Sequence, residues 1–232
     1  MSEFDIITDL AKQALTISTP TGNSDNSLWD RARRLVCNVE HICQLPELAK
    51  TGLQIDHFCL ITATYFSDAG LAHCLKAENI TAKLAISDGN GDDLLDFCTQ
   101  TIEKNLNPAI DKAKIQKINR IITESSNHFT RMTEAMILSD ARNLDDMGLV
   151  GIFNKFRRYI IGGKGVSDAL QGWKRKIDYR YWQARLKESF HFKQVRKIAE
   201  QRLSVAEQFM NQLKIEAQAH DLQELSVNSA IV

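Results

Sequence analysis

Proline is scarce in this chain. Its 232 residues contain only Pro20, Pro46 and Pro108, so the long stretches between them lack the residue that most often ends a helix. Within these stretches apolar residues recur at three- and four-residue intervals, as in the segment from Phe4 to Ala14. Such spacing is typical of amphipathic helices. The sequence therefore predicts an all-α protein.

We expect one compact helical domain with long C-terminal helices. A chain of this length with 44% apolar residues can bury a substantial core. The division expected is an N-terminal helix at 1–20, a helical domain at 21–220 and a flexible tail at 221–232. Ser27, followed by Asp30, resembles a helix N-cap with an acidic first turn. The expected helices cover residues 4–19, 27–45, 54–66, 92–105, 108–126, 132–146, 149–160, 167–189 and 193–220.

The charge balance argues against attraction of a charged partner by the electrostatic field of the whole chain. The 29 basic and 29 acidic residues cancel, so neither nucleic acid nor a membrane surface is an expected partner. The five cysteines are odd in number and form no Cys-x-x-Cys pair. Nothing at the N-terminus resembles a signal peptide, and no apolar run reaches the roughly 20 residues needed to cross a membrane. We expect a soluble, cytoplasmic protein with reduced cysteines, and homo-oligomerisation stays open.

Two short motifs match binding loops only superficially. The segment from Ile86 to Asp92 has Asp88, Asn90 and Asp92 at alternate positions, but the glycine and glutamate of a calcium loop are replaced by Asp93 and Thr99. We interpret it as a solvated turn. The segment from Gly162 to Gly165 lacks the P-loop frame. The six histidines are scattered, with no pair spaced to share a metal on one helical face.

Residues 173–185 interleave aromatic and basic side chains. Mixtures of this kind occur on surfaces that bind nucleic acids. Because the whole chain is neutral and the aromatic residues lie at near-helical spacing, we favour a packing helix with a basic solvent face. The residues concerned are Trp173, Lys174, Arg175, Lys176, Tyr179, Arg180, Tyr181, Trp182 and Arg185.

The segment from Ile137 to Phe153 carries the most specific motif. It contains Asp140-Ala-Arg-Asn-Leu-Asp145, followed by glycines at 148 and 151. This pattern resembles the HD superfamily of metal-dependent phosphohydrolases, where the segment runs Asp-Ala-Asp-(Arg/Lys)-Leu-Asp-x-x-Gly-x-x-Gly-Ile and its second aspartate coordinates the cation. Arg142 stands in that place. A guanidinium has no lone pair for a metal and repels one.

Three weaker frames extend the resemblance over roughly residues 25–216. Where the family has its His-Asp pair, this chain has Ser67 and Asp68. In the family frame Trp-x-His-x-x-Arg-Val, Arg31 takes the histidine position and Arg34 the arginine position. A further family histidine matches Ser125, although the nearby His128 leaves that register open. Asp145 matches an aspartate that commonly has a structural role in the family.

If the resemblance holds, the metal site has lost most of its donors. Arg31, Ser67 and Arg142 replace three ligands, and Asp68 alone is a poor metal site. We therefore expect neither a metal nor a cofactor, and no catalytic residue can be named. A buried Asp68 without its cation would be an unpaired charge, so we expect an ion pair with Arg142, Arg31 or both. The alternative is that both arginines point to solvent.

The favoured function is a noncatalytic, HD-related protein with a binding or regulatory role. Arg31, Arg34 and Arg142 would be candidates to bind a small anion. One alternative is a phosphohydrolase acting on a nucleotide or phosphate ester with shifted ligands, such as Asp68 and Asp140 with a nearby histidine. A second alternative is a structural interaction protein that associates through its C-terminal helices.

Overall fold

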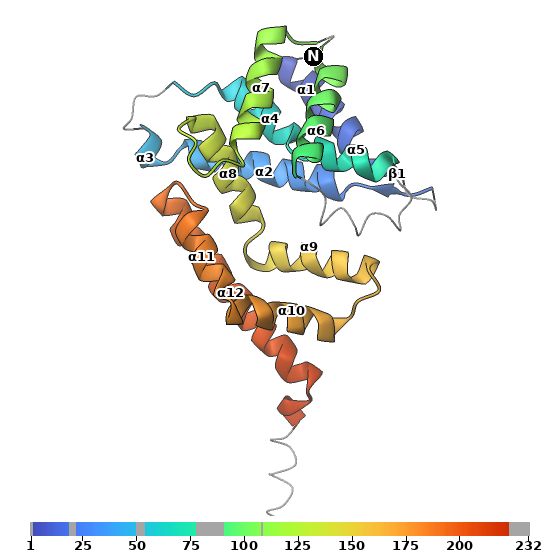
Figure 1. Ribbon diagram of the computed structural model, residues 1–232, viewed down its shortest axis with the longest axis vertical. Coiled ribbons are helices and arrows are strands. Elements are labelled where there is room, and N and C mark those ends of the chain that lie inside the picture. Colours follow the sequence, from blue (N-terminus) through green and yellow to red (C-terminus); the bar gives the residue numbers. More distant parts are fainter. Residues whose placement is uncertain (1, 19–21, 50–53, 78–90, 108, 223–232) are drawn as a thin grey trace, which may run out of the picture. The chain divides into compact units, whose positions relative to one another are not determined.

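The computed structural model describes residues 2–18, 22–49, 54–77, 91–107 and 109–222 (Figure 1). Apart from two short strands, β1 (Ile17–Ser18) and β2 (Ser24–Asp25), the regular structure in these ranges is helical. The predicted all-α fold class is confirmed. None of the helices in these ranges is long and apolar enough to cross a membrane. The segment 86–92, interpreted as a solvated turn, lies almost wholly outside the described residues.

The chain divides into two units, residues 1–145 and 146–232. This boundary lies inside the segment 21–220 that the sequence presented as one domain. The helices of the first unit are α1 (Glu3–Leu15), α2 (Ser27–Cys43), α3 (Pro46–Ala49), α4 (His57–Phe66), α5 (Ala69–Ala77), α6 (Gly91–Leu106), α7 (Lys112–Glu124) and α8 (Thr133–Asp145). Those of the second are α9 (Gly148–Ile161), α10 (Val166–Asp178), α11 (Tyr181–Glu188), α12 (Lys193–Ala217) and the 3-10 turn η2 (His220–Leu222).

Helix α4 is the centre of the first unit. Nearly all of its residues are buried, and it packs against α1, α2, α7 and α8. The helix is apolar on almost every side, as expected of a central buried element. Asp56 caps the helix, because its carboxylate accepts a hydrogen bond from the Cys59 backbone N–H at 3.0 Å. Helix α1 also packs on α2, α5 and α6, so the N-terminal helix belongs to this unit.

The start of α2 differs from the prediction. Asn26, not Ser27, occupies the N-cap position, and Ser27 is already helical. The reason is local. The Asp25 carboxylate accepts a hydrogen bond from the Ser27 backbone N–H at 3.0 Å, which satisfies one of the free amides at this helix end and lets the helix begin one residue earlier.

In the second unit, a predicted long helix is broken. Residues 167–189 form α10 and α11, separated at Arg180, which has a left-handed backbone with φ of 51°. In an unbroken helix, Trp173 and Trp182 would lie about 13.5 Å apart along the axis. The break brings their ring centroids to 5.2 Å. Aromatic packing across the turn thus accompanies the local backbone strain.

The core of the second unit forms where α9 meets α12. Ile152 packs with Ala206 and Met210, and the partly buried Phe156, Leu170, Trp173 and Leu213 cover this cluster. The two glycines of the 137–153 motif set the start of α9. Gly148 has φ of +77°, a conformation that favours glycine. A Cβ atom on Gly151 would lie 2.0 Å from the Asp146 carbonyl oxygen. Their spacing therefore has a backbone reason that involves no metal.

Candidate functional site: a buried aspartate and arginine cluster

Asp68 lies in the turn between α4 and α5 and is 6% exposed. Arg31, on α2, donates a hydrogen bond from Nη1 to Asp68 Oδ2 at 2.5 Å. Arg142, on α8, places Nη2 at 4.0 Å from Asp68 Oδ1. Residues that are far apart in the sequence thus converge on one carboxylate. Of the two contacts, the one from Arg31 is the closer and the less exposed.

Arg31 also connects Asp68 to a second buried carboxylate, Asp145. Its Nε donates to Asp145 Oδ2 at 3.2 Å. Arg34, one turn further along α2, donates from Nε to Asp145 Oδ1 at 2.9 Å and from Nη2 to Oδ2 at 3.4 Å. Asp145 is 2% exposed. These bonds join α2 to the end of α8 and to the turn between α4 and α5.

The arginines keep Asp68 ionised. Burial alone would raise the pKa of the Asp68 carboxyl, because it disfavours the charged form. The positive charges of Arg31 and Arg142, with the Arg31 hydrogen bond, outweigh that effect and hold the pKa below its usual value. Arginine cannot deprotonate in this range. Asp68 and its two arginines therefore stay charged, and their contacts depend on where the helices place these side chains.

The remaining positions of the resemblance are mostly hydrogen-bonded to backbone. Ser67 is buried and donates from Oγ to the Thr64 carbonyl at 3.0 Å. Ser125 is buried and donates to the Ile122 carbonyl at 2.7 Å, whereas His128 is exposed. The buried position in that frame is therefore the serine. Asp140, named above as a shifted ligand in the phosphohydrolase alternative, is fully buried on α8.

The chemistry available at this cluster is limited. Among the described residues, no group of three or more His, Cys, Asp or Glu side chains is placed to hold a metal ion. Burial raises the pKa of the nearby Cys98 thiol to about 11, and that of Cys59 to about 12. A thiol with so high a pKa is a weak nucleophile at neutral pH. The cluster can hold helices together, and it offers few free donors for an anion.

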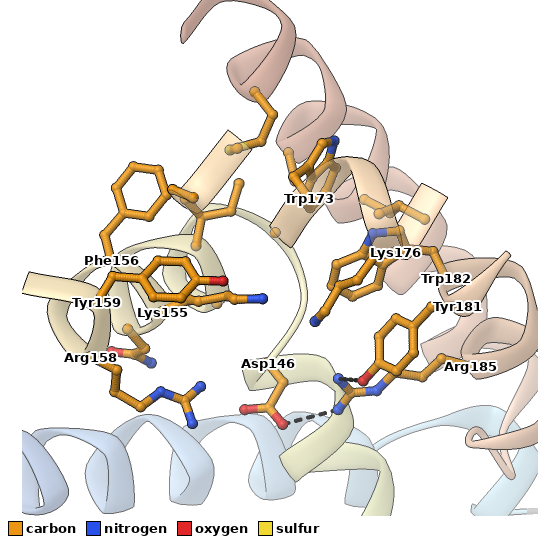
Figure 2. A pocket seen from close by; sticks show the side chains of 18 residues that line it. Asp146, Lys155, Phe156, Arg158, Tyr159, Trp173, Lys176, Tyr181, Trp182 and Arg185 are labelled. Atoms are coloured by element: carbon orange, nitrogen blue, oxygen red, sulfur yellow. Dashed lines mark hydrogen bonds and ion pairs between the residues drawn. The ribbon is translucent and has the colours of Figure 1, made fainter. Parts of the chain in front are cut away.

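Two functional features were missed or misread from sequence. The pairing of Asp145 with Arg31 and Arg34 follows only from the packing of α2 on α8. The basic and aromatic residues 173–185 do not form one helix, although Lys174, Arg175 and Arg180 are exposed as a basic solvent face requires. Lys176 is half-buried and lines a hollow within the second unit, to which Arg185 also contributes (Figure 2). The unusual mixture of residue types was the signal available for it.

Comparison with known proteins shows the fold but not a family. No protein-family profile and no curated protein matches the sequence. The selenomethionine form of YpgQ from Bacillus subtilis matches with a TM-score of 0.57 and 18% identity, over 93% of this chain and 96% of that chain. YpgQ in complex with ADP gives 0.55 and 19%, over 93% and 97%. The Lin1889 protein from Listeria innocua gives 0.56 and 18%, over 94% and 98%.

Proposed function

We propose that this protein is a noncatalytic relative of the HD superfamily with a binding or regulatory role. In this proposal the Asp68, Asp145 and arginine cluster occupies the place of the metal. The observation that carries it is the position of Arg31. Its guanidinium contacts both Asp68 and Asp145 at the point where the sequence resemblance expects a cation-binding histidine.

The charge arrangement supports a structural replacement. A divalent cation would offset the charge of a buried carboxylate and link the helices that supply its ligands. Arg31 and Arg142 provide positive charge to Asp68 from two helices. Gly70, two residues after Asp68, also has a packing role: a Cβ there would lie 2.0 Å from the Leu94 carbonyl oxygen on α6. The local sequence pattern can thus persist without catalysis.

The ligand of this proposal is a small anion. One solved structure with a similar fold is YpgQ in complex with ADP, which makes a nucleotide the first class to test. Arg34 and Arg142 are the more exposed arginines of the cluster, with side chains 37% and 31% exposed. Arg31 already donates hydrogen bonds from Nε and Nη1 to carboxylates. Any anion at this cluster would therefore meet Arg34 or Arg142 before Arg31.

Metal content and hydrolysis of the purified full-length protein test the proposal. We expect no stoichiometric manganese, iron, nickel or zinc by elemental analysis. We also expect no hydrolysis of nucleotides or simple phosphate esters above a protein-free blank. About one metal ion per chain bound near Asp68, together with hydrolysis, would instead assign the phosphohydrolase that uses shifted ligands.

A gain of metal binding provides a sharper test. The triple substitution Arg31→His, Ser67→His and Arg142→Asp restores the donor types of the resemblance beside Asp68. We expect it to take up zinc or manganese, measured by titration, with wild-type protein as the reference. Arg33→His is the matched control, because Arg33 is exposed on the same helix. Equal uptake by the triple variant and this control would refute the assignment of the metal positions.

A further inference from the structure

A hollow within the second unit combines basic and aromatic side chains from three helices (Figure 2). We call it the basic and aromatic hollow. Its lining includes Lys155 and Arg158 of α9, Lys176 of α10, and Tyr181, Trp182 and Arg185 of α11. Leu203, Ala206 and Met210 of α12 add apolar lining. The cavity volume is about 200 Å³, which suits a small molecule or part of one.

The positive charge in this hollow is poorly balanced. Asp146 is the carboxylate that lines it, and its Oδ2 accepts a bond from Arg185 Nη2 at 2.9 Å. Within residues 146–222, no carboxylate lies at ion-pair distance from Lys155, Arg158 or Lys176. Figure 2 shows the side chains of Lys155 and Lys176 extending from different helices toward the same space. Gathering like charges in a partly buried place costs free energy unless an anion joins them.

The lowered pKa of Lys176 reflects this excess of positive charge. Burial, then the charges of Lys155, Arg185 and Arg158, lowers the pKa of the Lys176 ammonium to about 8. The groups facing it are cations on α9 and α11, the phenol of Tyr181 and the Asp146 carboxylate, while α12 contributes apolar side chains. A phosphate between Lys155 and Lys176 would return the missing negative charge. It would also favour the protonated form of Lys176.

The aromatic side chains beside these lysines provide flat apolar surfaces. Lys176 Nζ lies 4.3 Å from the ring centroid of Tyr181 and 4.5 Å from that of Trp182. Trp182 is 6% exposed, and its indole Nε1–H is buried without a hydrogen-bond partner among the described residues. A buried donor left unpaired is costly and calls for a ligand or water. This observation is independent of the charge argument.

A neighbouring hollow extends the same surface. It shares Lys155, Tyr159, Lys176 and Tyr181 with the first and adds Arg175 and Tyr179, with a volume of about 340 Å³. Lys155 and Lys176 therefore border both spaces. Gly172 leaves room for the Tyr159 hydroxyl close to α10, because a Cβ at this position would lie 2.4 Å from that hydroxyl. A bound molecule can thus place charge at the lysines and a ring in either space.

We infer that the basic and aromatic hollow binds a small anion that carries a planar ring, of the nucleoside phosphate class. The phosphate lies against Lys155 and Lys176, and the ring lies against the tyrosine and tryptophan side chains. Cation–π contacts hold the lysine chains in place before the ligand arrives. This site goes beyond the proposed function, because it uses none of the residues of the Asp68 cluster.

Calorimetric titration of the full-length protein with ADP, adenosine and inorganic pyrophosphate tests the site. We expect saturable binding of ADP, weaker binding of pyrophosphate and the weakest of adenosine, with a change in tryptophan fluorescence on ADP binding. The double substitution Lys155→Gln and Lys176→Gln should weaken ADP binding by about tenfold or more. Lys174→Gln is the matched control, because Lys174 lies on the same helix, is 77% exposed and pairs with Asp178.

Several outcomes would overturn the inference. These are no saturable binding of ADP or pyrophosphate to wild-type protein, equal losses of ADP affinity in the double variant and the control, or tighter binding of a single-stranded oligonucleotide than of ADP.

If the double variant does not fold, proton uptake by wild-type protein on binding ADP decides. Titrations at pH 8 in two amine buffers of different ionisation enthalpy should show net uptake of protons as ADP binds, and none would contradict the lysine assignment. Metal-free, inactive protein that fails to bind ADP would reject this site without touching the proposed loss of catalysis.

Discussion

At the scale of single residues, Asp68 has the clearest structural role. Replacing Asp68 with alanine removes the carboxylate that accepts a hydrogen bond from Arg31 Nη1. The largely buried guanidinium then loses this ion pair. We expect Asp68→Ala to lower the free energy of unfolding by about 3–5 kcal/mol. Arg142→Ala should cost at most about 1 kcal/mol, because that side chain is 31% exposed and its contact is 4.0 Å long. Urea denaturation measures both, and similar values for the two would contradict the assigned order.

The lowered pKa of Asp68 also predicts a pH dependence. Because the folded pKa lies below the unfolded value of about 3.9, its stabilising contribution is complete above that value. It is lost as pH falls from there toward the folded pKa. Asp68→Asn should therefore lose less stability than wild-type protein when pH is lowered from 5 to about 2. Parallel acid-denaturation profiles in the two proteins would show that Asp68 does not carry the effect.

Lys176, unlike Asp68, lowers stability at neutral pH, because its lowered pKa disfavours the charged form that dominates there. Its folded pKa of about 8 lies below the ordinary lysine value of 10.5, so the unfolded chain holds the proton more tightly between these values. Stability from this group therefore rises as pH increases from about 8 to 10.5, and the cost is fully present below 8. Lys176→Met should raise the Tm at pH 7 by roughly 2–4 °C, allowing for screening by water at a half-buried site. It should also weaken ADP binding, and scanning calorimetry without ADP tests the stability part alone.

The sequence predicted the residues around Asp68 better than the bonds among them. Motif spacing singled out Arg31, Arg142 and Asp68, and all three meet in the structure. The second carboxylate, Asp145, was assigned only a general structural role. Its bonds to Arg31 and Arg34 depend on the rotation and offset of α2 against α8, which local sequence does not encode.

At the scale of secondary structure elements, the start of α9 depends on two glycines. A Cβ at position 151 would meet the Asp146 carbonyl at 2.0 Å, and that backbone atom cannot move as a flexible side chain would. We expect Gly151→Ala to destabilise the protein by about 1–3 kcal/mol. Gly165→Ala, at the N-cap of α10, has open space around its Cβ and should cost only a few tenths of a kcal/mol. Guanidinium denaturation compares the two, and equal midpoints would contradict the close approach.

Helix boundaries were harder to predict than the helices themselves. The break between α10 and α11 has no proline or glycine to signal it, because Arg180 adopts the left-handed conformation. Packing of Trp182 on Trp173 favours the turn, and that gain arises from tertiary structure. Periodicity alone treats residues 167–189 as continuous, since both helices keep the apolar spacing across the break.

At the scale of the whole molecule, the fold class followed from composition and periodicity, because few prolines and repeated apolar spacing leave little alternative to helices. The boundary between Asp145 and Asp146 did not follow, since it falls inside a motif with no linker composition. Net charge was similarly uninformative about sites. A sum of zero conceals a paired cluster around Asp68 and an unbalanced one around Lys176, which lie in different units.

The double contact of Arg31 also bears on how such a protein can change over generations. One guanidinium pairs with both Asp68 and Asp145. Any single substitution of Arg31 therefore removes a cationic partner from two buried carboxylates at once. Under the proposed function, a histidine returning alone to this position would be selected against for stability before it could bind a metal. Recovery of the chemistry would require several changes together. The arginine therefore makes the loss of catalysis difficult to reverse one mutation at a time, even in a cell where the metal is abundant.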